Sequence, residues 1–195
     1  MGQMKDRMLR GELYNGADAE MTADFARAQD LLYRFNGSAP AEQAERDAIL
    51  AELLGSLGDG VHIRPPFHLE YGTRVSVGAG TFVNFGCVML DVVAITIGAA
   101  CQVATRVQFL TATHPIHPEP RRLGWESGEP IVVGDNVWLG GGAILCPGVT
   151  IGDDTVVGAG AVVTRDLPAG VIAVGTPARI LREIGERDRV TIPEL

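Results

Sequence analysis

The chain has 195 residues, of which 46% are hydrophobic and 21% charged, which suits one domain with a small appendage. Its 16 Lys and Arg residues against 24 Asp and Glu residues give a net charge of −8, which argues against a nucleic-acid partner. No apolar stretch has membrane-spanning length, and residues 1–15 are too mixed and charged for a secretory signal, so we expect a cytoplasmic protein with no membrane partner.

Residues 1–60 predict a helical cap. A first helix is indicated by an apolar face at helical spacing that comprises Phe25, Ala28, Leu32 and Phe35. Thr22 is a candidate N-cap for this helix. A second helix is predicted to begin at Ser38 and to end near Gly55 or Gly58. Because both helices are too short to be stable alone, we expect them to pack on the segment that follows.

From about residue 75 to residue 180 an aliphatic residue recurs every six positions. The clearest run comprises Val133, Leu139, Leu145, Ile151, Val157 and Val163. This period matches neither a helix nor an alternating strand. It suits a repeating unit of one short strand and one tight corner, and three such units make one triangular coil. Glycine often follows the aliphatic residue, which predicts a permissive backbone at the corners. A β-sandwich would place its turns at wider, less regular spacing. We therefore predict a left-handed parallel β-helix over residues 61–182 and a tail over residues 183–195.

The repeat is interrupted between Phe109 and Ile131, which predicts a protruding loop over residues 110–130. A long loop inside a repeat array is usually functional or disordered. His114 follows a coil strand at the root of the loop and is the candidate catalytic residue, whereas His117 is expected to be an ordinary solvated side chain.

The three cysteines have no metal-like spacing, and no metal is expected. Cys87 and Cys101 occupy inward positions of the repeat, where a small side chain fills the core. Cys146 precedes Pro147 at an outward corner, where a reactive role is left open.

Several short motifs together resemble the maltose and galactoside O-acetyltransferases over nearly the whole chain. The motifs are Gly11-Glu-Leu-Tyr14, Phe35-Asn36, Pro65-Pro-Phe67, Tyr71-Gly72, Asn84-Phe85, Leu90-Asp91, Thr111-Ala-Thr-His-Pro115, Val137-Trp-Leu-Gly-Gly141, Pro147-Gly-Val149, Gly158-Ala-Gly160, Val163-Thr164 and Gly175-Thr-Pro-Ala-Arg179. The resemblance implies a sugar O-acetyltransferase that uses acetyl-CoA as co-substrate and assembles as a homotrimer with active sites between subunits.

The catalytic residues implied by the resemblance are His114, Asn84 and Gly141. A histidine suits removal of a proton from a sugar hydroxyl at neutral pH. The backbone amide of Gly141 is expected to stabilise the negative oxygen of the tetrahedral intermediate, with help from Asn84. Transfer is direct, so no cysteine or serine nucleophile is needed.

The resemblance also assigns the binding residues. The cofactor contacts it implies are Trp138, Gly141, Ala159, Thr164, Arg165, Pro177, Arg179 and Arg182, whose arginines suit phosphates. The acceptor contacts it implies are Asp18, Glu70, Phe82, Asn84, Asp91 and Glu126. Asp18 is equally well explained as a helix-terminal acid, and Glu126 is expected to orient the base or the sugar. Because Glu70 and Asn84 lie on neighbouring coils, we expect both to face one sugar.

Val92 stands where galactoside enzymes carry an acid, which favours a maltose-like or glucose-like acceptor. The alternatives are another hydroxyl acceptor, an amino sugar, or a non-catalytic assembly module. A carbonic-anhydrase-type zinc enzyme is disfavoured because His62 and His68 precede the regular repeats. A serine acetyltransferase shares the coil, but the N-terminal cap and the acceptor positions of this chain do not resemble those of that enzyme.

Overall fold

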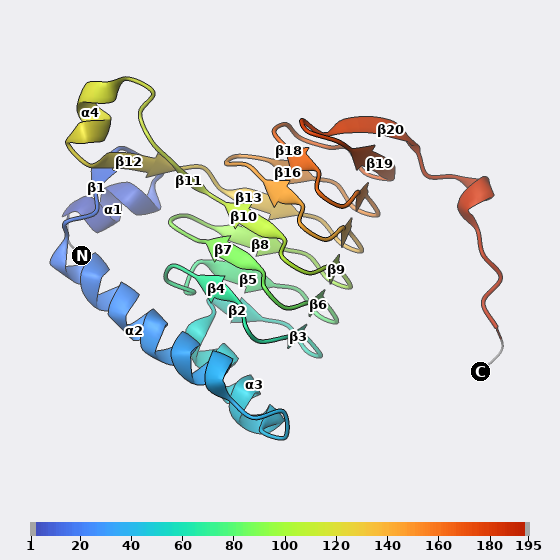
Figure 1. Ribbon diagram of the computed structural model, residues 1–195, viewed down its shortest axis with the longest axis horizontal. Coiled ribbons are helices and arrows are strands. Elements are labelled where there is room, and N and C mark those ends of the chain that lie inside the picture. The colour runs from blue at the N-terminus through green and yellow to red at the C-terminus, as the bar shows by residue number, and fades with distance from the viewer. Residues whose placement is uncertain (1–2, 194–195) are drawn as a thin grey trace.

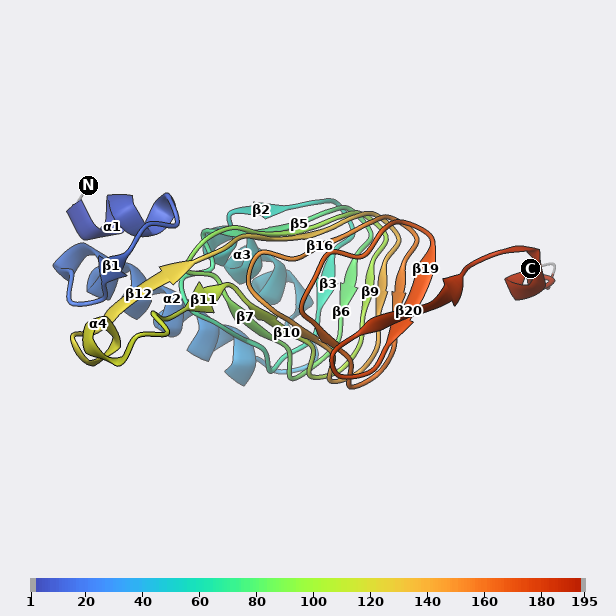
Figure 2. The ribbon, with the colours of Figure 1, turned by 90° about the horizontal axis from the view of Figure 1, so that it is seen from above.

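The computed structural model describes residues 3–193, and its body is the predicted left-handed parallel β-helix with a helical cap at one end (Figure 1). The expected segments 1–60 and 183–195 each extend two residues outside the described range. Figure 2 shows the coils stacked along one axis, with each strand lying over the strand of the preceding coil. No described helix is long and apolar enough to cross a membrane.

Three sheets form the faces of the β-helix. The first face carries β2 (Ser56–Leu57), β5 (Val75–Val77), β8 (Ile95–Ile97), β13 (Ile131–Val133) and β16 (Thr150–Ile151). The second face carries β3 (His62–Ile63), β6 (Phe82–Val83), β9 (Gln102–Val103), β14 (Trp138–Leu139), β17 (Val156–Val157), β19 (Val171–Val174) and β20 (Arg179–Glu183). The third face carries β4 (His68–Leu69), β7 (Val88–Leu90), β10 (Gln108–Leu110), β15 (Ile144–Leu145) and β18 (Val162–Val163). Neighbours pair in parallel, except that β20 runs antiparallel to β19.

The six-residue period is confirmed by burial. The aliphatic residues of the clearest run are at most 1% exposed, and the inward Cys87 and Cys101 are 0% exposed. The expected role of the following glycines is wrong, however. Gly140 does not need an unusual backbone; a Cβ there would lie 2.5 Å from the backbone nitrogen of Ala159 on the next coil. The left-handed conformation falls two residues later, as at Gly142 with φ of 70°.

The cap comprises α1 (Gln3–Leu9), α2 (Ala19–Gly37) and α3 (Gln43–Leu53). The predicted N-cap Thr22 is wrong, because Asp18 accepts the backbone N–H groups of Glu20 and Met21 and starts α2 earlier. The second helix begins later than predicted because the N–H of Ser38 caps the end of α2 instead. The apolar sides of α2 and α3 join the β-helix core, as expected.

The loop between Phe109 and Ile131 is ordered. It contains β11 (Ala112–Thr113), α4 (Pro118–Arg122) and β12 (Trp125–Gly128). Strand β12 pairs antiparallel with β11 on one side and with β1 (Tyr14–Asn15) of the cap on the other. His117 is not idle, because its side chain accepts the N–H of Glu119 and caps α4. The loop is thereby fixed to the N-terminal cap.

Candidate active site

The predicted site residues of one chain gather at two different corners of the β-helix. Asn84, Gly141 and Ala159 each follow a strand of the second face, so they lie at the corner between the second and third faces, which we call the Asn84 corner. The Glu70 corner lies between the third and first faces. It carries Glu70, Asp91, the loop with His114, Thr164 and Arg165, which all follow strands of the third face. The whole third face separates the two groups.

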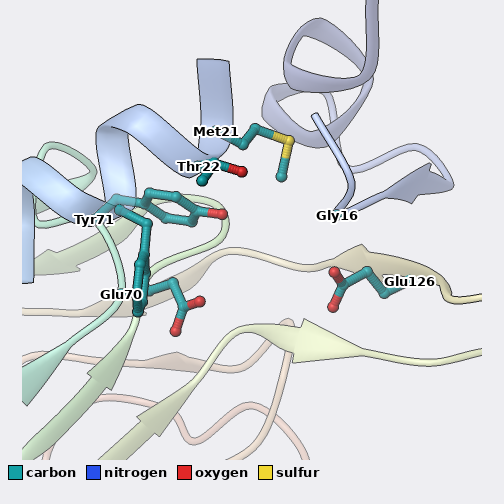
Figure 3. A pocket seen from close by; sticks show the side chains of 7 residues that line it. Gly16, Met21, Thr22, Glu70, Tyr71 and Glu126 are labelled. Carbon is teal, nitrogen blue, oxygen red and sulfur yellow. The ribbon is translucent and has the colours of Figure 1, made fainter. Parts of the chain in front are cut away.

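A cavity of about 280 Å³ opens at the Glu70 corner beneath α2 (Figure 3). Its lining residues are Gly16, Met21, Thr22, Phe25, Glu70, Tyr71 and Glu126. In Figure 3 the carboxylates of Glu70 and Glu126 point toward one another across the open space. Of the predicted acceptor residues, this cavity therefore brings together Glu70 and Glu126.

The cavity is acidic. Burial and the nearby carboxylates of Asp91 and Glu126 raise the pKa of Glu70. Burial and the charge of Glu70 also raise the pKa of Tyr71 to about 12, so its hydroxyl stays protonated at neutral pH. An uncharged hydroxyl and two carboxylates form a polar site that suits ligands rich in hydrogen-bond donors.

Asp91 does not line this cavity but lies beneath it. Its side chain is 0% exposed and accepts the backbone N–H groups of Glu70 at 3.1 Å, Tyr71 at 2.8 Å and Arg74 at 3.4 Å. Burial raises the pKa of Asp91, although these N–H bonds and the charge of Arg74 act in the opposite direction. In this chain Asp91 thus holds the turn that presents Glu70.

Three lining residues on α2 were not identified from the sequence. Phe25 was expected on the inner face of its helix, but it is 42% exposed and faces the cavity, and Met21 and Thr22 lie beside it. Asp18 instead caps α2, the alternative left open for it. The helical spacing of α2 placed Phe25 with the core residues and did not single out Met21 or Thr22, because the opposite wall with Glu126 comes from the loop that pairs with β1.

A second cavity of about 190 Å³ lies at the Asn84 corner. Its lining residues are Phe82, Asn84, Gln102, Val103, Ala104 and Trp138. The Oδ1 atom of Asn84 accepts the N–H of Phe85 at 2.9 Å, which leaves the Nδ2 group without a partner among the described residues. Trp138 is 54% exposed on the outer surface rather than part of the core. Phe82 stacks on His62, with ring centroids 5.8 Å apart, so one of its faces is already covered.

Gly141 offers a backbone donor at the same corner as this cavity. The N–H of Gly140 donates to the carbonyl of Val157 at 2.7 Å, and the N–H of Gly142 donates to that of Thr105 at 2.8 Å. Between them, the N–H of Gly141 has no acceptor within the described part of the chain. A fixed and unpaired donor is what stabilisation of a developing oxyanion requires.

The predicted phosphate contacts lie near the C-terminal end of the β-helix. Arg165 and Arg179 line one cavity of about 320 Å³, together with the acidic Asp166 and the apolar Leu167, Ala178 and Ile180. Thr164, Ala159 and Pro177 are exposed. Arg182 lies in β20, where its guanidinium forms an ion pair with Asp188 at 2.6 Å. Two arginines against one aspartate leave this cavity with a net positive charge, whereas the charge of Arg182 is neutralised by Asp188.

His114 is exposed immediately after β11, and its imidazole has no hydrogen-bond partner among residues 3–193. Glu126 accordingly does not orient it within one chain. The expectation that Glu70 and Asn84 face one sugar is also wrong for a single chain, because they line separate cavities at different corners.

No group of three or more His, Cys, Asp or Glu side chains in the described range is placed to hold a metal ion. Cys146 is half-buried, and burial raises the pKa of its thiol, which disfavours the reactive thiolate.

Known proteins share this architecture over nearly its full length. A family model for the maltose acetyltransferase hexapeptide capping motif matches residues 7–58, and one for the bacterial transferase hexapeptide (six repeats) matches residues 130–165. Nodulation protein L from Rhizobium meliloti (strain 1021) is 49% identical over 176 residues, which cover 90% of this chain and 96% of that protein.

Solved structures of relatives share the fold of this chain. A maltose O-acetyltransferase from Clostridium difficile 630 superposes with a TM-score of 0.93 at 40% identity and covers 95% of this chain and 99% of its own. A galactoside acetyltransferase in complex with coenzyme A also has a TM-score of 0.93, at 35% identity, over 96% of this chain and 94% of its own.

A capped parallel β-helix with one ordered histidine loop defines this protein as a hexapeptide-repeat acetyltransferase. Within that class, the chain belongs to the maltose/galactoside O-acetyltransferase family, whose members use acetyl-CoA to acetylate sugars.

Proposed function

We propose that this protein transfers the acetyl group of acetyl-CoA directly to a hydroxyl of a maltose-like or glucose-like sugar. The observation that carries the proposal is the N–H of Gly141, which has no acceptor among residues 3–193 and lies at the same corner as the exposed Trp138 and Asn84. These groups supply a surface for the thioester and donors for its carbonyl oxygen.

In the proposed reaction, His114 removes the proton of the sugar hydroxyl as its oxygen attacks the thioester carbon. The N–H of Gly141 and the Nδ2 group of Asn84 stabilise the negative carbonyl oxygen of the intermediate. The intermediate collapses when the carbon–sulfur bond breaks, and the imidazolium of His114 returns its proton to the leaving thiolate. Acetylated sugar and free coenzyme A are the products.

The cofactor contacts proposed for the phosphates are Arg165, Arg179 and Arg182, because these cations lie beyond Trp138 toward the C-terminal end. Trp138 is proposed to contact the pantetheine arm. Thr164, Ala159 and Pro177 are exposed along the same end and are proposed as further contacts.

The acceptor is proposed to lie against Glu70 and Glu126, with Phe25 and Tyr71 as apolar walls. Val92 stands where galactoside enzymes carry an acid, so this position has no carboxylate to offer a galactoside. Its side chain is 5% exposed and packs with Tyr14 and Tyr71. This supports the preference for glucosyl acceptors.

We also propose a homotrimer in the cytoplasm. His114 and the Glu70 cavity lie at one corner of the chain, and the Asn84 cavity with Gly141 lies at another. Closed threefold symmetry lets the Glu70 corner of one subunit meet the Asn84 corner of the next, which completes each site.

The test is a panel of glucose, maltose, galactose, lactose, N-acetylglucosamine and glucosamine, scored by thiol release from acetyl-CoA and by detection of the acetylated sugar. Glucosamine belongs in the panel because two carboxylates also accept an ammonium group. We expect glucose or maltose to be acetylated on oxygen and the His114→Ala variant to be nearly inactive. Thiol release that no sugar stimulates would overturn the proposal.

A further inference from the structure

A row of outward side chains on the second face connects the proposed thioester site with Arg182. Successive strands place Trp138, Val156, Ile172 and Arg182 in register. Neighbouring strands lie about 4.8 Å apart, so Trp138 and Arg182 are separated by about 14 Å along this row. An extended pantetheine arm that begins near Gly141 therefore reaches the end of the row with its phosphates.

The guanidinium of Arg182, at the end of this row, already binds a carboxylate of the protein itself, that of Asp188. The Nη1 and Nη2 atoms of Arg182 donate to the two oxygens of Asp188 at 2.7 and 2.6 Å, and Nη1 also donates to the carbonyl of Glu183 at 3.0 Å. Such a fork on two carboxylate oxygens is also the way an arginine holds a phosphate.

The carboxylate is charged at neutral pH. The Arg182 guanidinium and the N–H of Gly185, which donates to Asp188 at 2.9 Å, lower the pKa of Asp188 to about 2. By contrast, Arg165 and Arg179 form no ion pair among residues 3–193. Asp188 therefore neutralises one of the three arginines proposed for the cofactor.

Asp188 belongs to a segment that is otherwise weakly attached. After β20 the chain leaves the body of the β-helix (Figures 1 and 2), and Asp188 ends a short 3-10 helix, Glu186–Asp188. Beyond it Val190 and Ile192 are 83% and 82% exposed. The N–H of Ile184 still donates to the carbonyl of Gly170 at 2.8 Å, so beyond Ile184 the ion pair with Arg182 is the contact among residues 3–193 that holds this segment to the β-helix.

We propose that Asp188 is an internal competitor for the phosphate end of acetyl-CoA. A phosphate of the cofactor takes the Nη1 and Nη2 groups of Arg182 from Asp188, and the segment 185–193 is released when the cofactor binds. The proposal rests on the proposed cofactor role of Arg182. Asp188 is a positioning residue here, since it acts on the cofactor only through that guanidinium.

The experiment compares the parent protein with Asp188→Asn, Glu186→Gln and Arg182→Gln. Glu186→Gln is the matched control, because it removes one carboxylate from the same 3-10 helix, where Glu186 pairs only with the exposed Arg189 among residues 3–193. The dissociation constant of coenzyme A is measured by calorimetry, and trypsin cleavage after Arg189 is followed with and without coenzyme A.

We expect Asp188→Asn to bind coenzyme A about two- to fivefold more tightly, a small effect because exposed ion pairs are weak. Glu186→Gln should match the parent protein, and Arg182→Gln should bind more weakly. Coenzyme A should speed cleavage after Arg189 in the parent protein but not in Asp188→Asn, whose segment is already free.

Weaker or unchanged binding by Asp188→Asn, or protection of the segment by coenzyme A, would overturn the competition. If Arg182→Gln also leaves the binding of coenzyme A unchanged while sugar acetylation persists, then both the competition by Asp188 and the cofactor role of Arg182 are wrong. If no sugar is acetylated at all, the fault lies in the proposed function.

Discussion

The backbone N–H of Tyr71 donates to the buried carboxylate of Asp91 at 2.8 Å, and this contact joins the first coil to the second at the acceptor cavity. Tyr71 and the preceding Glu70 both face the cavity, whereas Asp91 does not. The carboxylate therefore acts on an acceptor through the turn that it holds.

Asp91→Ala should lower the free energy of unfolding by about 1–3 kcal/mol, because it leaves buried N–H groups of the turn without an acceptor. The Michaelis constant for sugar should rise as Glu70 and Tyr71 move, and that for acetyl-CoA should not. Denaturant unfolding and steady-state kinetics measure the two effects. Asp91→Asn keeps one acceptor oxygen and should be milder. An alanine variant as stable as the parent protein would show that Asp91 does not have this structural role.

His114→Ala should reduce turnover at least ~10²-fold, the usual scale for loss of a general base, and leave the melting temperature nearly unchanged because the side chain is exposed. Thiol release from acetyl-CoA measures turnover. His117→Ala is the matched control from the same loop; it removes the cap of the five-residue α4 and should be mild in activity. Comparable turnover in both variants would exclude His114 as the base.

Arg179→Ala should raise the Michaelis constant for acetyl-CoA more than that for sugar, because Arg179 lines the cavity with Arg165 and forms no ion pair among the described residues. Added salt should act in the same direction on the parent protein, since it screens charge between exposed groups. Arg34→Ala removes an arginine from α2 in the cap and serves as the control. An equal response of both variants would contradict the phosphate assignment.

Glu70→Gln should stabilise the protein increasingly as pH rises. The pKa of Glu70 is raised in the folded state by burial and by the charges of Asp91 and Glu126. Its contribution to stability is therefore present below the unfolded pKa of about 4.3 and is lost as pH rises through the folded pKa. Melting temperatures of the two proteins should be similar near pH 4 and diverge toward pH 7. A difference in melting temperature that does not change with pH would show that burial and the neighbouring charges do not shift the ionisation of Glu70.

The fold was predictable because the repeat is a local signal: each inward aliphatic residue needs only the next coil to be buried. The same holds for the inward Cys87 and Cys101. The contact between β1 and β12 was not predictable, because Tyr14 and Glu126 are far apart in the sequence and belong to no period. Only this pairing brings Phe25 and Glu126 to one cavity.

The roles of single acids were harder to predict for a related reason. The family resemblance implied a sugar contact for Asp91, whose side chain is instead fully buried. Charged side chains are seldom fully buried, and the N–H groups of the turn that stabilise this burial are visible only in three dimensions. Asp188 was likewise assigned only to a tail, although it engages Arg182.

The last prediction concerns the division of the site between corners. His114 and Asn84 lie at different corners of one chain, so in the proposed trimer each site takes His114 from one subunit and Asn84 from the next. The variants His114→Ala and Asn84→Ala should each be nearly inactive alone. When both are co-expressed and mix at random, about a quarter of the sites combine an intact His114 with an intact Asn84. Co-purified mixed trimers should therefore regain up to about a quarter of the parent activity, whereas separately purified variants mixed without exchange should regain none. Mixed trimers that stay inactive would place both residues in a site of a single chain.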